Sequence, residues 1–385
     1  MTFLQSNEER KKICFVASTA MTINAFLQEP IRMLAKSNEV YVATNLSARD
    51  SIPVIKDPKK IISIPLKRKI SLVADVVALF GLVLLLRKHQ FDIVHSMTPK
   101  AGFLVMVASF FARVPVRIHT FTGQVWCTKK GFSRFFLKQL DKVTALFATH
   151  ILVDSPTQYD FLLDEGVINK RKASVLGIGS VSGVDLNKFK PNLAVRNKLR
   201  SELNFSEDDV VVLFLGRLTA DKGMLDLVLA FAKTHANRPF VRLLIVGPDE
   251  ENLLADLQRV APNCIDSIHH VGFTDTPQHY MAASDLLCLP SYREGFGGVV
   301  IEAAAVGIPA VGSRIYGLMD AIAENKSGLL FEAKDVSALN DCLMQLVDNK
   351  QLRLRLGQNA KQRAESYFSS KVLVKAWLDY YRMKL

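Results

Sequence analysis

Cysteine is scarce in this chain and never closely paired. The 385 residues include five cysteines, and none belongs to a Cys-x-x-Cys motif. The odd number and the wide spacing argue against a disulfide framework and a zinc site, and they favour a reducing compartment. We expect each thiol to be a small buried apolar group. The five are Cys14, Cys127, Cys264, Cys288 and Cys342.

Long apolar runs are also missing. The most apolar stretch, residues 70–86, has 17 residues and contains Asp75. A helix that crosses a bilayer needs about 20 residues, and a carboxylate within it is costly in lipid. We therefore expect a helix buried in the protein. The polar N-terminal sequence MTFLQSNEERKK is unlike a signal peptide, so we expect a cytoplasmic location.

Metal-binding patterns are absent as well. The chain has no Asp-x-Asp motif and no group of histidines with metal-ligand spacing. His269 and His270 are neighbours in an expected strand, where successive side chains point to opposite faces. Joint ligation by this pair is therefore disfavoured, and we expect a site without a metal cofactor.

Positive charge is in excess, but only in one half. The net charge of the chain is +12. Residues 1–190 hold 27 Lys and Arg against 14 Asp and Glu, or +13, and residues 191–385 hold 22 against 23, or −1. A basic half indicates an anionic partner, which could be nucleic acid, an acidic membrane surface or a phosphorylated substrate. No motif for nucleic-acid recognition is visible, which disfavours the first of these.

Short apolar segments alternate with helical patterns, and the series restarts once. This alternation predicts parallel sheets covered on both faces, and therefore an α/β protein with two doubly wound domains. The break falls in GVDLNKFKPN, residues 183–192. Such sheets bind ligands at the carboxyl ends of their strands, and a cleft between two such domains is the expected site. The expected strands are KKICFVAS (11–18), NEVYVATN (38–45), DIVHSM (92–97), VPVRIHTF (114–121), THILVDS (149–155), DDVVVLFLGRL (208–218), VRLLIVGP (241–248), IHHVGFT (268–274), DLLCLPS (285–291) and IPAVGS (308–313).

Two stretches of the second half have the residues of a phosphate site. In LFLGRLTADKG, Gly216 ends a strand, and Arg217 and Lys222 follow, which can bind phosphate oxygens. In SYREGFGGVVIEAAAVG, glycines precede a short helix that begins near Gly298. Backbone N–H groups at such a helix start, where glycines allow close approach, form an anion site.

The two carboxylates of that stretch have separate roles by this reasoning. Glu294 precedes the helix, and Glu302 lies one turn into it, where it could accept hydrogen bonds from the hydroxyls of a ribose. Eight residues of helix span roughly 12 Å, whereas the paired carboxyls of a glycosidase lie roughly 5–9.5 Å apart. A hydrolytic pair is therefore disfavoured.

These motifs resemble the retaining family 4 glycosyltransferases of the GT-B fold. The resemblance rests on GRLTADKG and EGFGGVVIE, and on VDSPTQYDFL, GVDLNKF, VGPDEEN and HHVGFTDTPQHYMAASDLLCLPSYREGFG in the same order. It implies two facing Rossmann-like domains, an acceptor domain of residues 1–186 with a returning C-terminal helix (368–385), and a donor domain of residues 187–367. The C-terminal sequence YFSSKVLVKAWLDYYRMKL fits that helix. Its apolar face would hold Val372, Leu373, Ala376, Trp377 and Tyr380.

The resemblance also implies roles for residues of the donor domain. Gly216, Arg217 and Lys222 would hold the diphosphate of a nucleotide-sugar with the helix start at Gly298 and Val299. Glu302 would bind the ribose, and Glu294 would contact the transferred sugar. The remaining substrate-binding candidates are Gly295, Phe296 and Gly297, which would close over that sugar, and Gly272, Phe273 and Thr274, whose backbone would read the base.

The first half departs from the family at the acceptor side. FDIVHSMTPKAGFLVMVASFFARVPVRIHTFTGQ resembles the group that builds lipid-linked bacterial surface polysaccharides, but HTFTG stands where relatives often have His-Thr-x-His-Gly. The family histidine would fall on Thr122. Either His119 replaces it, or the site uses the hydroxyls of Thr120 and Thr122, which a strand would place on one face. Thr22 is a further candidate for substrate binding.

The expected activity follows from this resemblance. A sugar, guessed as N-acetylhexosamine or a related hexose, would move from a UDP-sugar to a polyprenyl-diphosphate-linked glycan during O-antigen or capsule synthesis. The basic aromatic segment TKKGFSRFFLKQLDKVTALF (128–147) would dock the protein on the cytoplasmic face of the inner membrane. A sugar-nucleotide epimerase of the same architecture and an inactive sugar-nucleotide binder remain alternatives.

Overall fold

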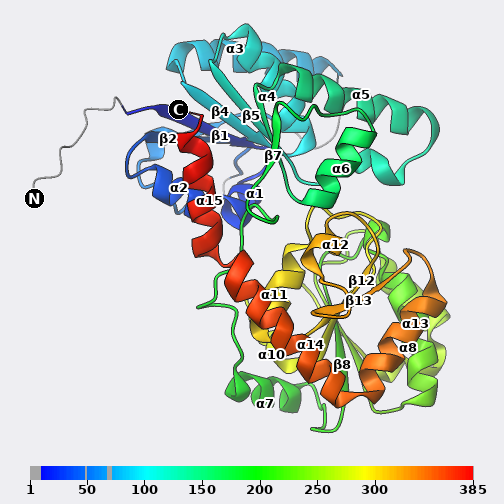
Figure 1. The fold of residues 1–385 in the computed structure, drawn as a ribbon. Coiled ribbons are helices and arrows are strands. Elements are labelled where there is room, and N and C mark those ends of the chain that lie inside the picture. Colours follow the sequence, from blue (N-terminus) through cyan, green and yellow to red (C-terminus); the bar gives the residue numbers. More distant parts are fainter. Residues whose placement is uncertain (1–9, 48–49, 67–71, 385) are drawn as a thin grey trace, which may run out of the picture. The chain divides into compact units, whose positions relative to one another are not determined.

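The computed structural model describes residues 10–47, 50–66 and 72–384, and these form two compact α/β units (Figure 1). The first unit comprises Met1–Asp154, Tyr159–Leu176 and Val374–Leu385, and the second comprises Ser155–Gln158 and Gly177–Leu373. Each unit contains one parallel sheet with helices around it, so the expected α/β class is confirmed. The N-terminal sequence expected to lack a signal peptide lies largely outside the described residues.

The first sheet has the strand order β3-β2-β1-β4-β5-β6-β7, and its strand pairs are parallel. The chain moves from β1 outward to β3 and then returns to β4 on the other side of β1. Ligands of doubly wound sheets bind where the order reverses in this way. The strands are β1 (Lys12–Ala17), β2 (Glu39–Thr44), β3 (Ile61–Ser63), β4 (Ile93–Met97), β5 (Val116–Phe121), β6 (His150–Val153) and β7 (Ala173–Val175).

Helices cover both faces of this sheet. Figure 1 shows α3, α4 and α5 side by side on one face, with α1, α2 and α15 on the other. The helices before the second sheet are α1 (Ala20–Phe26), α2 (Gln28–Leu34), α3 (Leu72–His89), α4 (Pro99–Phe111), α5 (Gly131–Phe147) and α6 (Pro156–Asp164). The last helix of the chain is α15 (Ser370–Arg382).

Helix α3 corrects one expectation. A helix does form over the apolar stretch, of which residues 70 and 71 lie outside the described part, but it is buried on one side only. Leu82 and Leu86 lie in the core, whereas the Phe80 side chain is 68% exposed. Asp75 is turned toward α4, where it forms an ion pair of 2.7 Å with Lys100. No helix of the described residues is long and apolar enough to cross a membrane.

Helix α5 carries fewer free charges than its sequence indicated. Arg134 and Lys138 both pair with Glu165, at 2.6 and 2.5 Å, and both lie over the ring of Trp126. The Trp126 indole in turn donates to the buried carboxylate of Asp141 at 2.7 Å. Two of the basic side chains expected to face a membrane are therefore engaged within the fold.

The C-terminal helix packs on the first sheet through a buried histidine. His95 on β4 bonds the Tyr381 hydroxyl through Nδ1 at 2.8 Å and the Thr120 hydroxyl through Nε2 at 2.7 Å. Its ring also packs against that of Trp377 in a tilted arrangement, with 5.3 Å between centroids. Burial lowers the pKa of His95 to about 3, so the ring stays neutral and both ring nitrogens are satisfied. The sequence placed Trp377 and Tyr380 on this face and missed Tyr381.

Replacing Tyr381 by phenylalanine should destabilise the first unit by about 1–3 kcal/mol, because one nitrogen of His95 loses its partner in the core. The neighbouring Tyr380 is a matched control, since its buried hydroxyl has no hydrogen-bond partner among the described residues. Tyr380→Phe should therefore be neutral or slightly stabilising. Urea unfolding followed by tryptophan fluorescence measures this unit, because both tryptophans of the chain, Trp126 and Trp377, lie in it. Equal effects of the two substitutions would contradict the anchoring role.

The second sheet repeats the doubly wound pattern with the order β10-β9-β8-β11-β12-β13, again with parallel pairs. The order reverses between β8 and β11, so the loops that follow these strands are where a ligand is expected. The strands are β8 (Val210–Leu215), β9 (Val241–Val246), β10 (Ile268–Val271), β11 (Leu286–Leu289), β12 (Ala310–Ser313) and β13 (Gly328–Phe331).

The helices of the second unit enclose two apolar cores, one on each face of the sheet. One core includes α11 and the π-helical turn Ala364–Phe368, and the other includes α8 and α13. The helices are α7 (Leu193–Glu202), α8 (Met224–Asn237), α9 (Leu257–Val260), α10 (Pro277–Ala283), α11 (Gly298–Val306), α12 (Leu318–Ala321), α13 (Val336–Asp348) and α14 (Lys350–Arg363).

Candidate active site

The loops after β8, β9 and β11 meet closely at the carboxyl edge of the second sheet. Gly223 has a φ of +65°, and a Cβ there would clash with the carbonyl oxygen of Pro290 in the loop after β11. A Cβ on Gly247, after β9, would likewise clash with the carbonyl oxygen of Gly216, after β8. Glycine is thus required where these backbones approach each other. The sequence segments GRLTADKG and SYREGFGG become neighbours in space.

Lys222 and Glu294 form a direct ion pair in this place. The Glu294 carboxylate also accepts a hydrogen bond of 2.8 Å from the Ser291 hydroxyl. Both charged side chains are mostly buried, with 20% and 12% of their areas exposed. The sequence assigned them separately to phosphate and sugar, and the structure brings them together. A bound diphosphate would share the Lys222 ammonium with this carboxylate.

The same two loops are joined by residues that the sequence analysis missed. Arg293 pairs with Asp221 at 3.2 Å, and the Tyr292 backbone N–H donates to the Asp221 carbonyl at 2.8 Å. The Tyr292 hydroxyl donates to Asp226 on α8 at 2.6 Å. The charged residues in SYREG and TADKG could have indicated these contacts. The two segments lie about seventy positions apart in the sequence, however, so no local pattern connects them.

Arg217 lies nearer to the surface than Lys222. Its guanidinium pairs with Glu250 at 2.8 Å, and the two side chains are 49% and 41% exposed. Exposed pairs of this kind contribute about 0–1 kcal/mol to stability. The pair is therefore weak enough for Arg217 to exchange Glu250 for a ligand phosphate.

The glycine turn leads into α11 without a capping side chain. Gly297 precedes the helix in the left-handed conformation with φ +78°, and its carbonyl accepts from the Val300 N–H at 2.8 Å. The N–H groups of a helix start that no side chain caps can bind an anion. The Phe296 side chain turns away into the core and packs on Phe368, so only its backbone belongs to this turn. Gly298 and Val299 begin the helix and are partly exposed.

Glu302 lies one turn into α11 and is half-buried. Its carboxylate has no hydrogen-bond or ion-pair partner among the described residues. Burial raises its pKa to about 7, against the opposing effect of the Lys188 charge. Hydroxyl donors of a ligand would stabilise the ionised form of such a group. Lys188 belongs to the GVDLNKF segment, to which the sequence analysis gave no role in the site.

The loop after β10 offers an aromatic surface beside the loop after β9. The Gly247 N–H donates to the carbonyl of Val271 at 2.9 Å, which joins the two loops. Phe273 is 67% exposed, and the Thr274 hydroxyl lies 3.2 Å from that of Thr276. Gly272 has open space around its Cα, so the base-reading candidates lie at an accessible edge.

The candidates of the first unit differ in accessibility. His119 is buried, its Nδ1 lies 2.8 Å from the Ser96 hydroxyl, and its ring fills the space beside Gly102 on α4. Burial lowers the pKa of His119 to about 3. Thr120 is buried and bonded to His95 on the opposite side of the strand. The expected separation of His119 from Thr120 is therefore confirmed, and both side chains lie in the interior, whereas β5 ends before Thr122.

Thr122 and Thr22 remain reachable from solvent. Thr122 follows the end of β5 and is half-buried. Thr22 lies in the first turn of α1, where its N–H donates to the Thr19 side chain at 3.4 Å and its hydroxyl lies 3.1 Å from that of Thr19. Within the first unit, the accessible candidates are therefore hydroxyl groups.

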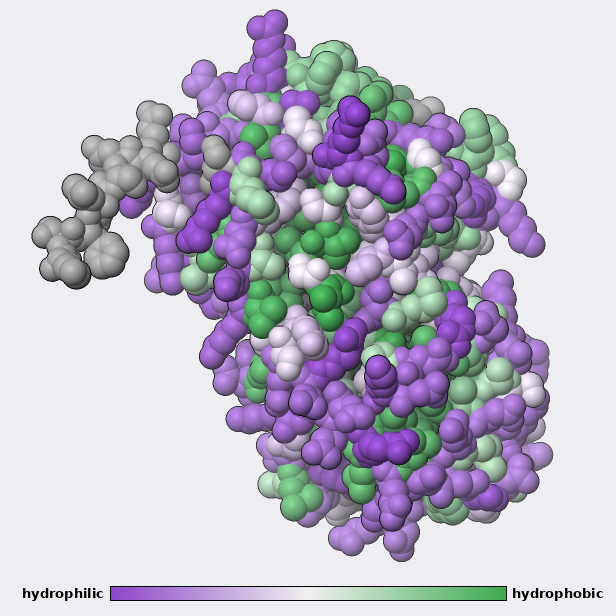
Figure 2. All heavy atoms as spheres, in the orientation of Figure 1, coloured by the Kyte–Doolittle hydropathy of each residue, from purple (hydrophilic) through white to green (hydrophobic). Residues whose placement is uncertain are grey.

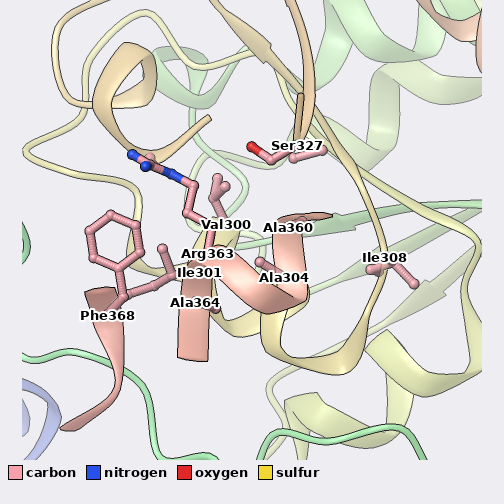
Figure 3. A pocket seen from close by; sticks show the side chains of 11 residues that line it. Val300, Ile301, Ala304, Ile308, Ser327, Ala360, Arg363, Ala364 and Phe368 are labelled. Carbon is pink, nitrogen blue, oxygen red and sulfur yellow. The ribbon is translucent and has the colours of Figure 1, made fainter. Parts of the chain in front are cut away.

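A small cavity is lined by residues of α11, of α14 and of the turn that follows α14. Figure 3 shows that it is lined mainly by apolar side chains of α11 and α14, with Arg363 and Ser327 as polar neighbours. Its volume of about 10 Å³ is at most enough for one water molecule. Arg363 donates to the Asp320 carbonyl at 2.6 Å and lies over the Phe368 ring. We read this cavity as a packing feature that supports α11. In the described part of the chain, no group of three or more His, Cys, Asp or Glu could hold a metal ion.

Comparison with known proteins identifies the family. Residues 195–363 match the model of glycosyl transferases group 1, and residues 31–179 match the glycosyl transferase 4-like domain. The chain is 32% identical over 318 residues to the capsular polysaccharide biosynthesis glycosyltransferase CapM of Staphylococcus aureus, which covers 80% of this chain and 81% of the relative. The protein therefore belongs to the family 4 glycosyltransferases of the GT-B fold.

A second relative and a solved structure agree with this membership. The UDP-Gal:alpha-D-GlcNAc-diphosphoundecaprenol alpha-1,3-galactosyltransferase of Escherichia coli is 28% identical over 335 residues, covering 84% of this chain and 85% of the relative. The sucrose-phosphate synthase from Thermosynechococcus elongatus superposes with a TM-score of 0.80 at 21% identity, over 97% of this chain and 99% of that one. The structural likeness establishes the fold, and the resemblance found in the sequence is confirmed.

Proposed function

We propose that this glycosyltransferase moves a sugar, with retention of configuration, from a UDP-sugar to a polyprenyl-diphosphate-linked glycan in bacterial surface polysaccharide synthesis. The proposed binding of the nucleotide-sugar donor rests on one observation. The Lys222–Glu294 ion pair lies beside the start of a helix that no side chain caps. The acceptor side rests on the activities for which the two relatives are named, one in capsule synthesis and one on a diphosphoundecaprenol-linked sugar. An N-acetylhexosamine or related hexose is the proposed cargo.

The residues divide the reaction between them. Lys222, Arg217 and the first N–H groups of α11 would bind the pyrophosphate and stabilise the charge that develops on it as the bond to the sugar breaks. The electron pair of that bond stays on the phosphate oxygen, and the acceptor hydroxyl forms the new bond on the same face of the sugar. Its proton passes to the leaving phosphate. Glu302 would orient the ribose, and Glu294 would contact the sugar.

No metal is needed in this scheme, because the cations of the site are side chains. Lys222 supplies a positive charge within the loop cluster, and Arg217 can join it when Glu250 releases its guanidinium. Hydrogen-bond donors fixed before the reaction stabilise developing charge without reorganising. We therefore propose that the reaction needs no metal ion.

The proposed place of action is the cytoplasmic face of the inner membrane, where a polyprenyl diphosphate is anchored. The basic first half supports this location. On α5, Arg134 and Lys138 are engaged with Glu165, whereas Lys129 and Lys130 precede the helix and are close in sequence to the exposed rings of Phe132 and Phe135.

The test is nucleotide release across a panel of UDP- and GDP-sugars, with and without a lipid-linked acceptor extract. We expect release of UDP from one sugar donor, at least tenfold faster with the acceptor. Lys222→Ala serves as the inactive control. Release of nucleotide together with an epimerised sugar, independent of acceptor, would identify an epimerase. Donor binding without turnover under every condition would identify an inactive binder.

A further inference from the structure

Helix α3 presents an apolar stripe to solvent. Val73, Val77, Phe80 and Leu84 are 65–78% exposed and follow one another at intervals of four, three and four residues. This spacing places them on one side of the helix, and the next position along the stripe is Arg87. Val76 beside the stripe is 53% exposed. Figure 2 shows apolar atoms gathered over α3. Exposed patches of this kind mark interaction sites in soluble proteins.

The opposite side of α3 packs against the core of the first unit and fixes the position of the helix. Ala78, Leu82 and Leu86 are buried in the core of the first unit. Asp75, the acidic residue of this helix, pairs with Lys100 on α4. The outward side of α3 therefore carries no carboxylate among the described residues, and its apolar side chains contribute nothing to the core.

A basic aromatic pocket adjoins the end of the stripe. It has a volume of about 540 Å³, and the described residues that line it include three arginines and no carboxylate. Burial lowers the pKa of Arg117, because a less hydrated environment disfavours the charged form of the side chain. The lining residues are Arg87, Phe110, Phe111, Arg113, Val114, Pro115 and Arg117.

The arginines of this pocket keep free donors. Arg87 gives one hydrogen bond of 3.0 Å to the Phe111 carbonyl, and Arg117 gives bonds of 2.7 Å to the carbonyls of Phe147 and Val114. Arg113 is exposed, and its guanidinium has no hydrogen-bond or ion-pair partner among the described residues. Guanidinium groups bind phosphate oxygens in pairs, so this pocket has the donors for a phosphate headgroup.

We propose that the α3 stripe and the arginine pocket together dock this protein on a leaflet of anionic phospholipid. Val77, Phe80 and Leu84 enter the acyl boundary, while Arg87 and Arg113 bind lipid phosphates at the headgroup level. An apolar stripe bordered at one end by arginines is complementary to a leaflet that has an apolar interior and anionic headgroups. A dry protein interface would instead bury three arginines against one carboxylate among the described lining residues, that of Asp92 in the adjoining hollow, which already accepts a hydrogen bond from the Lys12 N–H. In this arrangement the helix lies on the bilayer and does not cross it, because its sequence contains Asp75, Arg87 and Lys88.

This inference rests on the membrane location in the proposed function and goes beyond it in two ways. It moves the main contact from α5 to α3. It also predicts that apolar insertion contributes to binding, so that high salt weakens the attachment without abolishing it.

The apolar part is tested by Phe80→Ser/Leu84→Ser in flotation with vesicles of phosphatidylcholine and phosphatidylglycerol. We expect the vesicle affinity to fall on the order of 10- to 100-fold, because two large apolar side chains no longer enter the lipid. Leu354→Ser is the matched control, since Leu354 on α14 is 64% exposed and Leu84 is 67% exposed. Unchanged flotation of the double variant would overturn the proposal.

The ionic part is tested by Arg87→Gln/Arg113→Gln on the same vesicles. Each charge near an anionic leaflet is expected to change the affinity about fivefold, so the pair should lose about 25-fold. The loss should disappear on vesicles of phosphatidylcholine alone. Lys198→Gln, on an exposed side chain of α7, is the control. A loss that is equal on both kinds of vesicle would contradict headgroup binding.

The depth to which position 80 enters the lipid is measured with the Phe80→Trp variant. Both native tryptophans are buried, so quenching by brominated lipid reports the new side chain. We expect quenching with anionic vesicles and none with Leu354→Trp. If ultracentrifugation instead shows a dimer that Phe80→Ser/Leu84→Ser dissociates, and Phe80→Trp stays unquenched, a second copy covers this face. None of these readouts needs donor or acceptor, so they fail or succeed independently of the proposed activity.

Discussion

Lys222→Ala is expected to lower kcat/KM for the sugar donor by about 10²–10³-fold, the range found when a preorganised donor to developing charge is removed. Lys222 has one anionic partner, Glu294, and a mostly buried side chain. Its ammonium is therefore held in place before a ligand arrives. A diphosphate bound at the start of α11 would meet this charge without the loop having to reorganise.

The effect should be separable from a loss of stability. Removing Lys222 leaves the mostly buried Glu294 carboxylate without its counter-charge, so the melting temperature of the Lys222→Ala variant should fall, and its kinetics are measured at a temperature where the variant stays folded. Arg238→Ala is the control, because Arg238 forms an exposed pair with Asp348 at the amino end of β9, on the opposite edge of the sheet. We expect less than a threefold change in kcat/KM for that variant. Full activity of Lys222→Ala in steady-state kinetics would remove this residue from the phosphate site.

The sheets were the most predictable part of the molecule. Buried parallel strands are continuous apolar runs, and VVVLFL in β8 and VRLLIV in β9 lie within the segments expected. Period-two alternation also separated His119 from Thr120 correctly. The tertiary contacts of strand residues could not be predicted, because the alternation of side chains does not indicate whether a face of the sheet meets solvent or a helix. His119 faces α4 and Gly102, which no local pattern indicates.

Helix α3 shows a second limit of sequence reasoning. Its residues are apolar on nearly every side, and such a helix is either buried in a core or in contact with lipid. Hydropathy gives the same value in both cases. Only the packing of α4 against one side, with Phe80 left exposed on the other, shows that the helix is buried on one face alone. The Lys222–Glu294 contact could not be predicted from local sequence either. It forms because β8 and β11 are neighbours in the sheet, which brings together two loops that are distant in sequence.

Glu294→Gln should separate catalysis from nucleotide binding, because the substitution keeps the shape of the side chain and removes its charge. The amide oxygen can still accept from Ser291, so the loop should keep its conformation. Lys222 loses its counter-charge, and the site becomes more positive where the pyrophosphate binds. UDP affinity, measured by calorimetry, should therefore be unchanged or tighter. Turnover should fall on the order of 10²-fold as the contact to the sugar is lost.

The pair also predicts how the two substitutions combine. Contacting residues show coupling energies of about 0.5–3 kcal/mol, so Lys222→Ala/Glu294→Gln should lose less kcat/KM than the product of the two single losses. Glu332→Gln, at a side chain 71% exposed, is the control for removal of a carboxylate. Independent effects would mean that the ion pair has no joint role. A variant Glu294→Gln with weaker UDP binding and normal turnover would assign this carboxylate to the nucleotide, because only a group that acts on the sugar lowers kcat while leaving the UDP affinity intact.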